Sequence, residues 1–599
     1  MPATVIGELT ADESAIVLMA TGPAHEQAYL AQLLQLLTPL IKQTDPPGAL
    51  VLPATWPAVV QLAGTFGEAW RPGLALSAWL ARQVSYRTST PEALTVEPPA
   101  GLVPRSYQID GALIIAQTGK ALIFDEPGTG KTVTTILGLV ERAAAGHPVL
   151  PAVVVAPNAV VDSWVSHVRD WAPQWRAVAW RGTPNQRRAL AGSADVYVTS
   201  YGVTSRDAGE PLGSRPSKAA LKASPLLALR PATVVADECH KLKHQATEQS
   251  RAVRRLAEKA ANFVGLSGTP ITHNPGDLWP ALYCLEPGAY PSRERWVARY
   301  CRTVPGDYSA TVLGLEPRAE PEFRTTLLGQ HRRVAKADVL AELPPKVYSV
   351  RTVELPPAWR RAYDELEGQM LAQLPDGGEL SVMTVLAQLT RLSQLASAAA
   401  DIEVTTEVVE VDGIQEERTH TKVHLKAPSW KVDELLEVMT ERPGQPIVAF
   451  APSRQLMVLA GEAAVTAGYR VGYVVGGQTA RERTANVDAF QGKELDLCCV
   501  TTGAGGVGLT LTAAKTAVFL QRPWSLVEAL QSEDRLHRIG AEVHDSIEIV
   551  DVVAKKTIDS RVRTILRERA GALSELVQDP RIVAELLGGA AVRDLRRSA

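Results

Sequence analysis

Short strand-like runs that alternate with longer helical patterns are the feature of this sequence that most constrains its fold. Apolar runs that end just before a polar or glycine-rich cluster are typical of strands buried on both faces of a parallel sheet, with working loops at their C-terminal ends. The first series comprises Ala121–Phe124, Ala152–Ala156, Val196–Thr199, Thr233–Ala236 and Phe263–Leu266. The second series comprises Ile447–Phe450, Arg470–Val475, Leu497–Thr501, Ala517–Leu520 and Ile547–Val550. The pattern predicts two parallel-sheet domains of the α/β class.

The rest of the chain has a different character. Residues 320–400 have mostly helical patterns, and the alternation over 401–426 around Asp412-Gly413 predicts a β-hairpin. Prolines between Thr88 and Pro104 predict a linker. The expected organisation is an unassigned accessory region (1–99), a first lobe (100–290), helical protrusions with the hairpin (291–428), a second lobe (429–570) and a C-terminal helical tail (571–599).

Composition limits the class of protein. Of the 599 residues, 46% are hydrophobic and 21% are charged, which excludes a wholly disordered, collagenous or coiled-coil chain. The net charge of -3 excludes binding of nucleic acid by a global positive charge but allows a local groove. The sequence has no signal-peptide pattern at its start and no apolar stretch that could span a membrane. Together with the abundance of Arg and Ala, this predicts a cytoplasmic protein of a bacterial or phage-infected cell, with no membrane partner.

A candidate phosphate-binding loop follows the first predicted strand and precedes a helical pattern. Gly128 and Gly130 let backbone N–H groups close around phosphate oxygens, Lys131 can reach the β- and γ-phosphates, and Thr132 can ligate Mg²⁺. The usual first glycine of such a loop is replaced by Asp125. The candidate nucleotide-binding residues are Asp125, Glu126, Pro127, Gly128, Thr129, Gly130, Lys131 and Thr132.

Two adjacent acids, Asp237 and Glu238, follow a later strand of the first series. Asp237 can hold Mg²⁺ and Glu238 can polarise an attacking water, which is the pair that phosphoryl transfer needs. Lys131, Asp237 and Glu238 are therefore candidate catalytic residues, with Thr132 and Asp237 as metal ligands. His240 by itself is more typical of a capping or core histidine.

These motifs occur in an order that resembles the Swi/Snf-type translocases of helicase superfamily 2. The resemblance covers roughly residues 100–570, and the string Gln531–Gly540 is most similar to the annealing-helicase (HARP-like) branch. It implies two RecA-like lobes that use ATP and Mg²⁺. The residues that carry the resemblance are Tyr107-Gln108, Asp125–Thr132, Asp237–Lys243, Leu266–Ile271, Asn274, Leu278-Trp279, Arg332-Arg333, Leu343–Lys346 and Gln531–Gly540.

The resemblance also implies roles for residues outside the phosphate loop. Gln108 would read the adenine edge, Gly508 would contact the nucleotide, and Arg535 and Arg538 would act as arginine fingers. Coupling between the ATP site and nucleic acid would use Ser267, Thr269 and Gln531. The implied nucleic-acid contacts are Pro157, Asn158, Thr199, Tyr201, Thr502 and Gly505, with Trp164 equally compatible with a core position.

Two departures from the family pattern concern partner geometry more than ATP hydrolysis. Ala541 stands where glutamine is usual, and Trp524-Ser525-Leu526 replaces the usual Trp-Asn-Pro. The function we expect is an ATP-dependent DNA translocase or helicase on duplex or forked DNA. Two alternatives are a helicase for RNA or single strands with the same motor, and an ATP-binding scaffold that does not hydrolyse.

Overall fold

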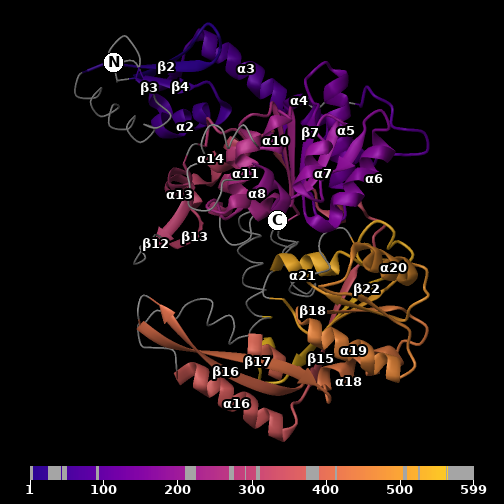
Figure 1. The fold of residues 1–599 in the computed structure, drawn as a ribbon. Coiled ribbons are helices and arrows are strands. Elements are labelled where there is room, and N and C mark those ends of the chain that lie inside the picture. The colour runs from indigo at the N-terminus through magenta and orange to yellow at the C-terminus, as the bar shows by residue number, and fades with distance from the viewer. Residues whose placement is uncertain are drawn as a thin grey trace, which may run out of the picture. The chain divides into compact units, whose positions relative to one another are not determined.

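The computed structural model divides the chain into two compact units, Met1–Val339 and Leu340–Ala599, and each unit is described by itself (Figure 1). The described residues are 4–23, 42–43, 50–88, 93–208, 224–268, 275–290, 292–304, 311–372, 390–411, 414–503, 509–523, 526–560 and 563. In this part of the chain, no helix is long and apolar enough to cross a lipid bilayer.

The first unit is built on a parallel seven-stranded sheet in the order β14-β6-β11-β10-β7-β9-β8. All five predicted strands are confirmed to within one residue at each end. The strands are β6 (Lys120–Ile123), β7 (Ala152–Ala156), β8 (Ala177–Ala179), β9 (Val196–Ser200), β10 (Thr233–Asp237), β11 (Asn262–Leu266) and β14 (His331–Arg332).

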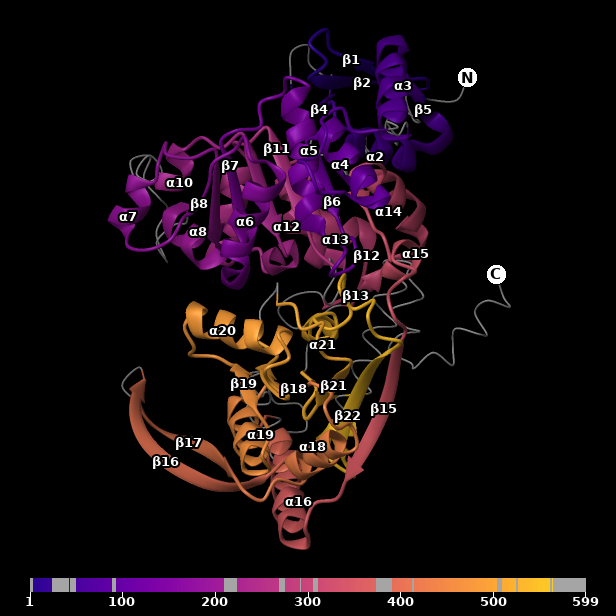
Figure 2. The ribbon, with the colours of Figure 1, turned by 90° about the vertical axis from the view of Figure 1, so that its right-hand side faces the viewer.

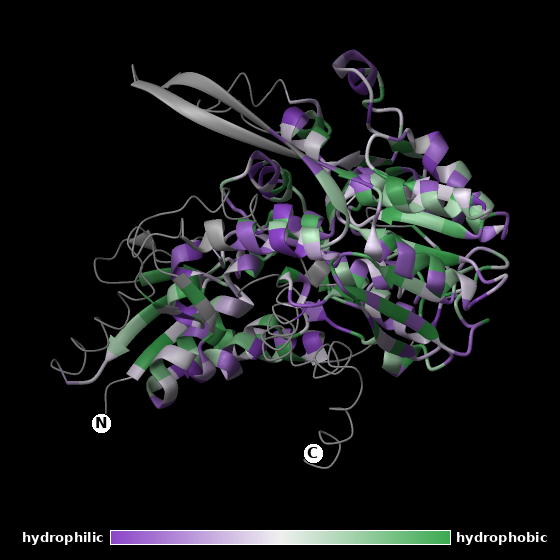
Figure 3. Ribbon diagram, turned by 90° about the horizontal axis from the view of Figure 1, so that it is seen from below, coloured by the Kyte–Doolittle hydropathy of each residue, from purple (hydrophilic) through white to green (hydrophobic). Residues whose placement is uncertain are grey.

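Helices cover this sheet and form its core with the strands. The strands β7, β10 and β11 are buried along their whole length, and Figure 3 shows that green, apolar residues are common on strands and purple, hydrophilic residues on helices. The helices are α4 (Ser106–Thr118), α5 (Lys131–Ala144), α6 (Val161–Trp171), α7 (Pro184–Ala189), α8 (Tyr201–Ala208), α10 (Pro225–Ala228), α11 (Glu248–Ala257), α12 (Trp279–Leu285), α13 (Arg293–Tyr300), α14 (Glu320–Leu327) and α15 (Lys336–Val339). A small hairpin of β12 (Cys301–Val304) and β13 (Thr311–Leu315) follows α13.

The sequence left the accessory region unassigned; its described residues form a five-stranded sheet with the helices α2 and α3 (Figure 2). We call residues 4–88 the accessory module. Its own core includes Val5, Ile16, Leu52 and Leu62, all at most 1% exposed. Its elements are β1 (Thr4–Leu9), β2 (Ala15–Thr21), β3 (Lys42–Gln43), β4 (Leu50–Pro53), α2 (Trp56–Phe66), β5 (Trp70–Pro72) and α3 (Leu74–Thr88), with sheet order β3-β4-β2-β1-β5.

The accessory module is joined to α13 and α14 by polar contacts. Trp56 Nε1 donates to the carbonyl of Thr325 at 2.8 Å, and Arg299 Nη2 donates to the carbonyl of Gln61 at 3.2 Å. Arg299 also forms an ion pair with Glu322 at 2.6 Å. The predicted linker is fixed as well, because the Val96 amide donates to the Glu141 carboxylate of α5 at 2.6 Å. The module is thus a structural part of the first unit.

The second unit contains a parallel six-stranded sheet in the order β15-β22-β21-β18-β20-β19. The five predicted strands are confirmed, and the last extends to Ala554. The strands are β15 (Lys346–Val353), β18 (Ile447–Ala451), β19 (Val471–Val474), β20 (Leu497–Thr501), β21 (Thr516–Phe519) and β22 (Ile547–Ala554). The helices are α16 (Pro357–Ala372), α18 (Trp430–Thr440), α19 (Arg454–Thr466), α20 (Ala480–Gln491) and α21 (Leu526–Glu533).

The interpretation of residues 320–400 as mostly helical is wrong at β15. This strand pairs in parallel with β22 from Lys346 to Val353. It lies at the edge of the sheet, so one face is solvated and Val347 is 49% exposed. An edge strand needs no continuous apolar run, which is why its sequence lacked the pattern that identified the buried strands.

The predicted β-hairpin is confirmed. β16 (Ala399–Val411) and β17 (Ile414–Lys426) pair in antiparallel register from Ala399 opposite Lys426 to Val411 opposite Ile414. The turn residues Asp412 and Gly413 lie outside the described residues.

We predict that Glu322→Ala loosens the packing of α14 against α13, the helix whose Arg299 also contacts the accessory module. The Glu322 carboxylate accepts from Arg299 and, at 2.6 Å, from the Tyr300 hydroxyl, so its removal takes an acceptor from each of these buried or half-buried donors. The expected loss is about 2 kcal/mol in the opening free energy of α14 amides, measured by hydrogen exchange. Glu13→Ala is the control, because its pair with Arg82 is more than half exposed and should be worth under about 1 kcal/mol. Equal exchange in both variants would contradict the prediction.

Candidate nucleotide-binding site

The predicted phosphate loop connects β6 to α5 in the first unit. Gly128 and Gly130 have φ values of +85° and +84°, in the left-handed region that glycine adopts without strain. Gly130 is the N-cap of α5, so the loop leads directly to a helix N-terminus. A Cβ added to Gly130 would overlap the side-chain amide nitrogen of Gln108 on α4. Backbone conformation and close packing therefore both require glycine at this position.

The outer part of the loop is held by two residues of α4. The Thr129 carbonyl accepts from the Tyr107 hydroxyl and from Gln108 Nε2, both at 3.0 Å. Gln108 Oε1 accepts from the Arg105 amide at 2.9 Å, and the whole side chain is buried. Gln108, which the resemblance assigns to adenine, thus joins its helix to the phosphate loop.

Lys131 is folded back over the loop. Its Nζ donates to the carbonyls of Asp125 at 2.8 Å and Glu126 at 3.2 Å. These contacts use two of the three donors of an ammonium group, so the third can reach a phosphate oxygen in the same cradle. The arrangement places a positive charge at the centre of the loop.

The two acids that begin the loop point into the protein. The Asp125 carboxylate is 1% exposed and lies 3.4 Å from Arg332 Nε, and burial raises its pKa against the opposing effect of Arg332 and Lys131. The Glu126 carboxylate accepts from the Lys336 amide at 2.9 Å. Arg332 of β14 and Lys336 at the start of α15 therefore hold these two side chains, while the Asp125 and Glu126 carbonyls accept from Lys131.

The acidic pair lies at the C-terminal end of β10, in the same sheet as β6. Asp237 Oδ2 accepts from Trp164 Nε1 at 2.9 Å, and the Asp237 carbonyl accepts from the Tyr201 hydroxyl at 2.8 Å. Burial, followed by the neighbouring charge of Glu238, raises the pKa of Asp237. The Trp164 bond opposes this rise and favours the ionised carboxylate.

Glu238 adopts a left-handed conformation with φ of +55° and is 4% exposed. Its Oε2 lies 3.2 Å from His240 Nδ1, and the same ring nitrogen lies 3.0 Å from Ser267 Oγ. Burial pushes the pKa of Glu238 upward, but His240, Lys131 and Lys241 outweigh it, so the pKa is lowered. His240 thus links the acidic pair to the loop after β11.

Gly268, the residue after Ser267, packs against the phosphate loop. A Cβ at Gly268 would lie 2.5 Å from Pro127 Cγ, so the two loops approach each other as closely as a glycine allows. Arg333 Nη1 lies 3.3 Å from the Gly268 carbonyl and 3.4 Å from the Phe124 carbonyl. Thr269, a predicted coupling residue, lies outside the described residues.

The phosphate-binding groups and oxygen ligands of this site fit a nucleoside triphosphate with Mg²⁺. Gly128, Gly130 and Lys131 form a cradle for phosphate, and the Thr132 hydroxyl with the Asp237 carboxylate supplies the oxygen ligands that Mg²⁺ prefers. The sequence pattern did not reveal Trp164 as the partner of Asp237, nor Arg332 and Arg333 as supports of the loops. Only the resemblance to the family drew attention to these residues, because their contacts form between segments that are distant in the chain.

The remaining predicted nucleotide residues belong to the second unit. Arg535 is 4% exposed, and burial, followed by the charge of Arg538, lowers its pKa to about 10. Arg538 Nη1 donates to the Leu509 carbonyl at 3.2 Å. Gln531 is half-buried near the end of α21. Gly505 and Gly508 lie outside the described residues.

The candidate nucleic-acid residues differ in accessibility. Asn158 is exposed and Pro157 half-buried after β7, so both can meet a partner. Thr199 and Tyr201 are buried, and the Tyr201 hydroxyl is engaged by Asp237. Thr502 of the second unit is 4% exposed. Contacts from the buried residues to nucleic acid would therefore have to come through neighbouring groups.

Comparison with known proteins gives two family matches. The SNF2-related domain matches residues 75–400, and the helicase conserved C-terminal domain matches residues 430–540. The chain is 25% identical over 492 residues to YwqA of Bacillus subtilis, a protein named as a candidate ATP-dependent helicase/translocase, covering 80% of this chain and 49% of that protein. It is also 25% identical over 482 residues to the mouse DNA annealing helicase and endonuclease ZRANB3, covering 78% of this chain and 40% of that protein.

A solved structure is similar over most of the chain. It is the Sulfolobus solfataricus SWI2/SNF2 ATPase core in complex with dsDNA, at 19% identity and a TM-score of 0.36, covering 82% of this chain and 98% of that one. The chain spans about half or less of the length of the two curated relatives above.

We predict that Gly130→Ala weakens ATP binding at least tenfold, as measured by titration with a fluorescent ATP analogue. The added methyl group would displace Gln108 and open the loop held by its amide. Gly146→Ala is a matched control, because Gly146 has a φ of +83° but nothing within 4 Å of an added Cβ. Both variants carry the same backbone strain of about 1 kcal/mol, so the difference between them isolates the contact with Gln108. Equal affinities would show that this contact does not shape the site.

Proposed function

The chain belongs to the SNF2-related family of helicase-like ATPases, and from that premise we propose that it couples ATP hydrolysis to movement along duplex or forked DNA. The observation that supports this most directly is the cluster in the first unit of Lys131, the Asp237-Glu238 pair and the His240–Ser267 contact. It combines a phosphate cradle with a pair of acids, which are the parts that phosphoryl transfer requires.

In the proposed reaction, Lys131 and the N-terminus of α5 neutralise the phosphates and hold the γ-phosphate in line for attack. Thr132 and Asp237 would hold Mg²⁺, which supplies charge stabilisation to the β- and γ-phosphate oxygens. Trp164 donates to one oxygen of the Asp237 carboxylate and thereby fixes its orientation. This positioning favours a single geometry for the transition state.

Glu238 is the proposed residue that orients the attacking water. Its lowered pKa keeps it ionised near neutral pH, so it can accept a hydrogen bond from water. The His240 ring contacts both Glu238 and Ser267, so a shift of Glu238 when the γ-phosphate leaves would be felt at the loop after β11. We propose this contact as the start of coupling, continued by Thr269 and by Gln531 of the second unit.

Arg535 and Arg538 are proposed as arginine fingers, on the strength of the family motif. A finger of this kind contributes roughly 10³ to 10⁵ in rate. Burial makes their charges costly, so an anionic partner would offset part of that cost. Gln108 and Gly508 are the proposed contacts to the rest of the nucleotide.

DNA is the proposed track, and the annealing-helicase branch is the proposed subgroup. Support comes from the names of relatives such as ZRANB3 and from the string Gln531–Gly540. The near-neutral net charge fits a local track that is released in each cycle, since tight electrostatic binding would stall a motor. Exposed Asn158 and its neighbour Pro157 are the proposed contacts on the first unit.

We predict that Lys131→Ala abolishes ATP turnover, because the central charge of the loop is lost. Turnover is measured with no nucleic acid and with single-stranded, duplex, forked and RNA substrates, and duplex or forked DNA should stimulate the unmodified chain most. Lys259→Ala, an exposed lysine of the same unit, should behave like the unmodified chain.

Three results would contradict the proposal. ATP turnover that survives Lys131→Ala would show that ATP is not hydrolysed at the assigned site. ATP turnover that nucleic acid does not change would contradict the proposed movement along DNA. Stronger stimulation by RNA would replace the DNA track with an RNA one.

A further inference from the structure

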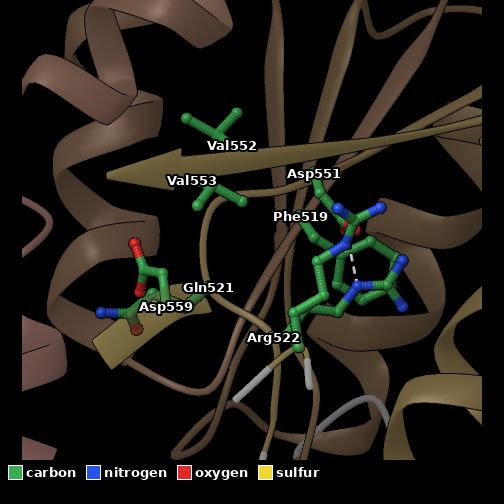
Figure 4. Close-up of a pocket in the computed structure, with 8 residues that line it drawn as sticks. Phe519, Gln521, Arg522, Asp551, Val552, Val553 and Asp559 are labelled. Carbon is green, nitrogen blue, oxygen red and sulfur yellow. Dashed lines mark hydrogen bonds and ion pairs between the residues drawn. The ribbon is translucent and has the colours of Figure 1, made fainter. Parts of the chain in front are cut away.

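Arg522, which follows β21 in the second unit, lies between two buried carboxylates. Its Nη1 donates to Glu533 Oε1 and its Nε donates to Asp551 Oδ1, both at 2.6 Å. Its guanidinium also lies 3.9 Å from the centre of the Phe519 ring. Figure 4 shows Arg522 beside Phe519 and Asp551 at the small pocket that these side chains line. A planar guanidinium can bridge two acids in this way, whereas a lysine ammonium cannot reproduce the fork.

Glu533 is the last residue of α21 and is fully buried. Besides Arg522, its carboxylate accepts from the Tyr348 hydroxyl at 2.9 Å and from Lys346 Nζ at 3.3 Å, both on β15. Burial alone would raise the pKa of Glu533, but Lys346 and Arg522 outweigh it and the pKa is lowered. Glu533 is therefore a charged acid with three donors around it.

The network joins segments that are distant in the chain. Arg522 and Glu533 connect β15, the end of β21, β22 and the end of α21. Lys346 Nζ also lies 3.3 Å from Asp534 Oδ1. The chain immediately after Glu533 carries the two candidate arginine fingers, so the network anchors that segment at its start.

The segment from Asp534 to Arg538 also contacts the chain before β15 and the chain before β21. His537 Nε2 lies 2.9 Å from the Pro344 carbonyl, next to β15. The Leu511 amide donates to the Arg535 carbonyl at 2.9 Å, and Arg538 donates to the Leu509 carbonyl. The backbone that carries Arg535 and Arg538 is thus fixed before their side chains meet any ligand.

Stability alone does not account for this network. Buried ion pairs contribute little compared with apolar side chains of similar size, because desolvation cancels most of their attraction. What they provide is a directional arrangement, since each donor has one geometry in which all partners are satisfied.

We infer that Arg522 and Glu533 are positioning residues that set the geometry of Arg535 and Arg538 for ATP hydrolysis. This inference rests on the proposed function, in which those two arginines act on the transition state. It assigns to the Arg522–Glu533 pair a role in rate rather than in nucleotide affinity, because the phosphate cradle and Gln108 belong to the other unit.

The first test is Glu533→Gln in the full chain. We expect kcat for ATP to fall at least tenfold while KM for ATP stays within twofold. Affinity for ADP with aluminium fluoride, which mimics the transition state, should fall by a similar factor, and affinity for ADP alone should not change. A residue that only stabilised the fold would not separate these two affinities.

Arg522→Lys is the second variant, and it decides the question if Glu533→Gln does not fold. It keeps the positive charge but cannot bridge Glu533 and Asp551 together, so the same fall in kcat is expected. The control is Glu441→Gln, since Glu441 is an exposed acid of the same unit that pairs with Arg351 and Arg442. Its kinetics should equal those of the unmodified chain.

The outcomes separate the inference from the proposed function. If folded Glu533→Gln or Arg522→Lys keeps kcat and the aluminium fluoride affinity while Lys131→Ala is inactive, the positioning role is wrong and the proposed function stands. If Lys131→Ala retains turnover, the proposed function itself is wrong.

Discussion

Desolvation of the Asp237-Glu238 pair is the constraint on which the rest of the first unit depends. Two adjacent carboxylates at 7% and 4% exposure repel each other and lose hydration, so the fold must supply compensation from several directions. Trp164 donates to the first acid, His240 contacts the second, and Lys131 contributes its charge to both. These partners come from α6, from the segment after β10 and from the start of α5, so several elements converge at the C-terminal end of β10.

Close packing then restricts how those loops can move. Gly130 faces Gln108 and Gly268 faces Pro127 without room for a methyl group, so the phosphate loop is closely packed against α4 and against the loop after β11. Arg332 and Arg333, which follow the edge of the same sheet, contact the phosphate loop and the Gly268 loop together. The second unit uses a related arrangement, in which Arg522 and Glu533 fix the start of its arginine-bearing segment.

The sequence predicted best the strands that are buried on both faces of a sheet. Strands such as β7 and β20 are continuous apolar runs, so their bounds were found to the residue, whereas the solvated edge strand β15 carries no such run. The phosphate-loop residues could be proposed from the sequence because the chemistry of such a loop demands a local spacing. The roles of Trp164 and Arg332 could not be predicted in this way. Each belongs to the site because folding brings it to a distant partner, Asp237 or Asp125, and no local sequence pattern indicates that contact.

The joint at α14 changes how the first ninety or so residues should be regarded. The prolines between Thr88 and Pro104 predicted a linker, yet Trp56 fastens the accessory module to α14, the helix before β14, and Arg299 of α13 donates to the module as well. The amide of Phe124 donates to the Arg332 carbonyl, so β14, which follows α14 in the chain, lies beside the strand that leads into the phosphate loop. A chain shortened at residue 100 would therefore leave the Thr325 carbonyl and Arg299 without these partners, in the segment that leads into β14 and its pairing beside the phosphate loop.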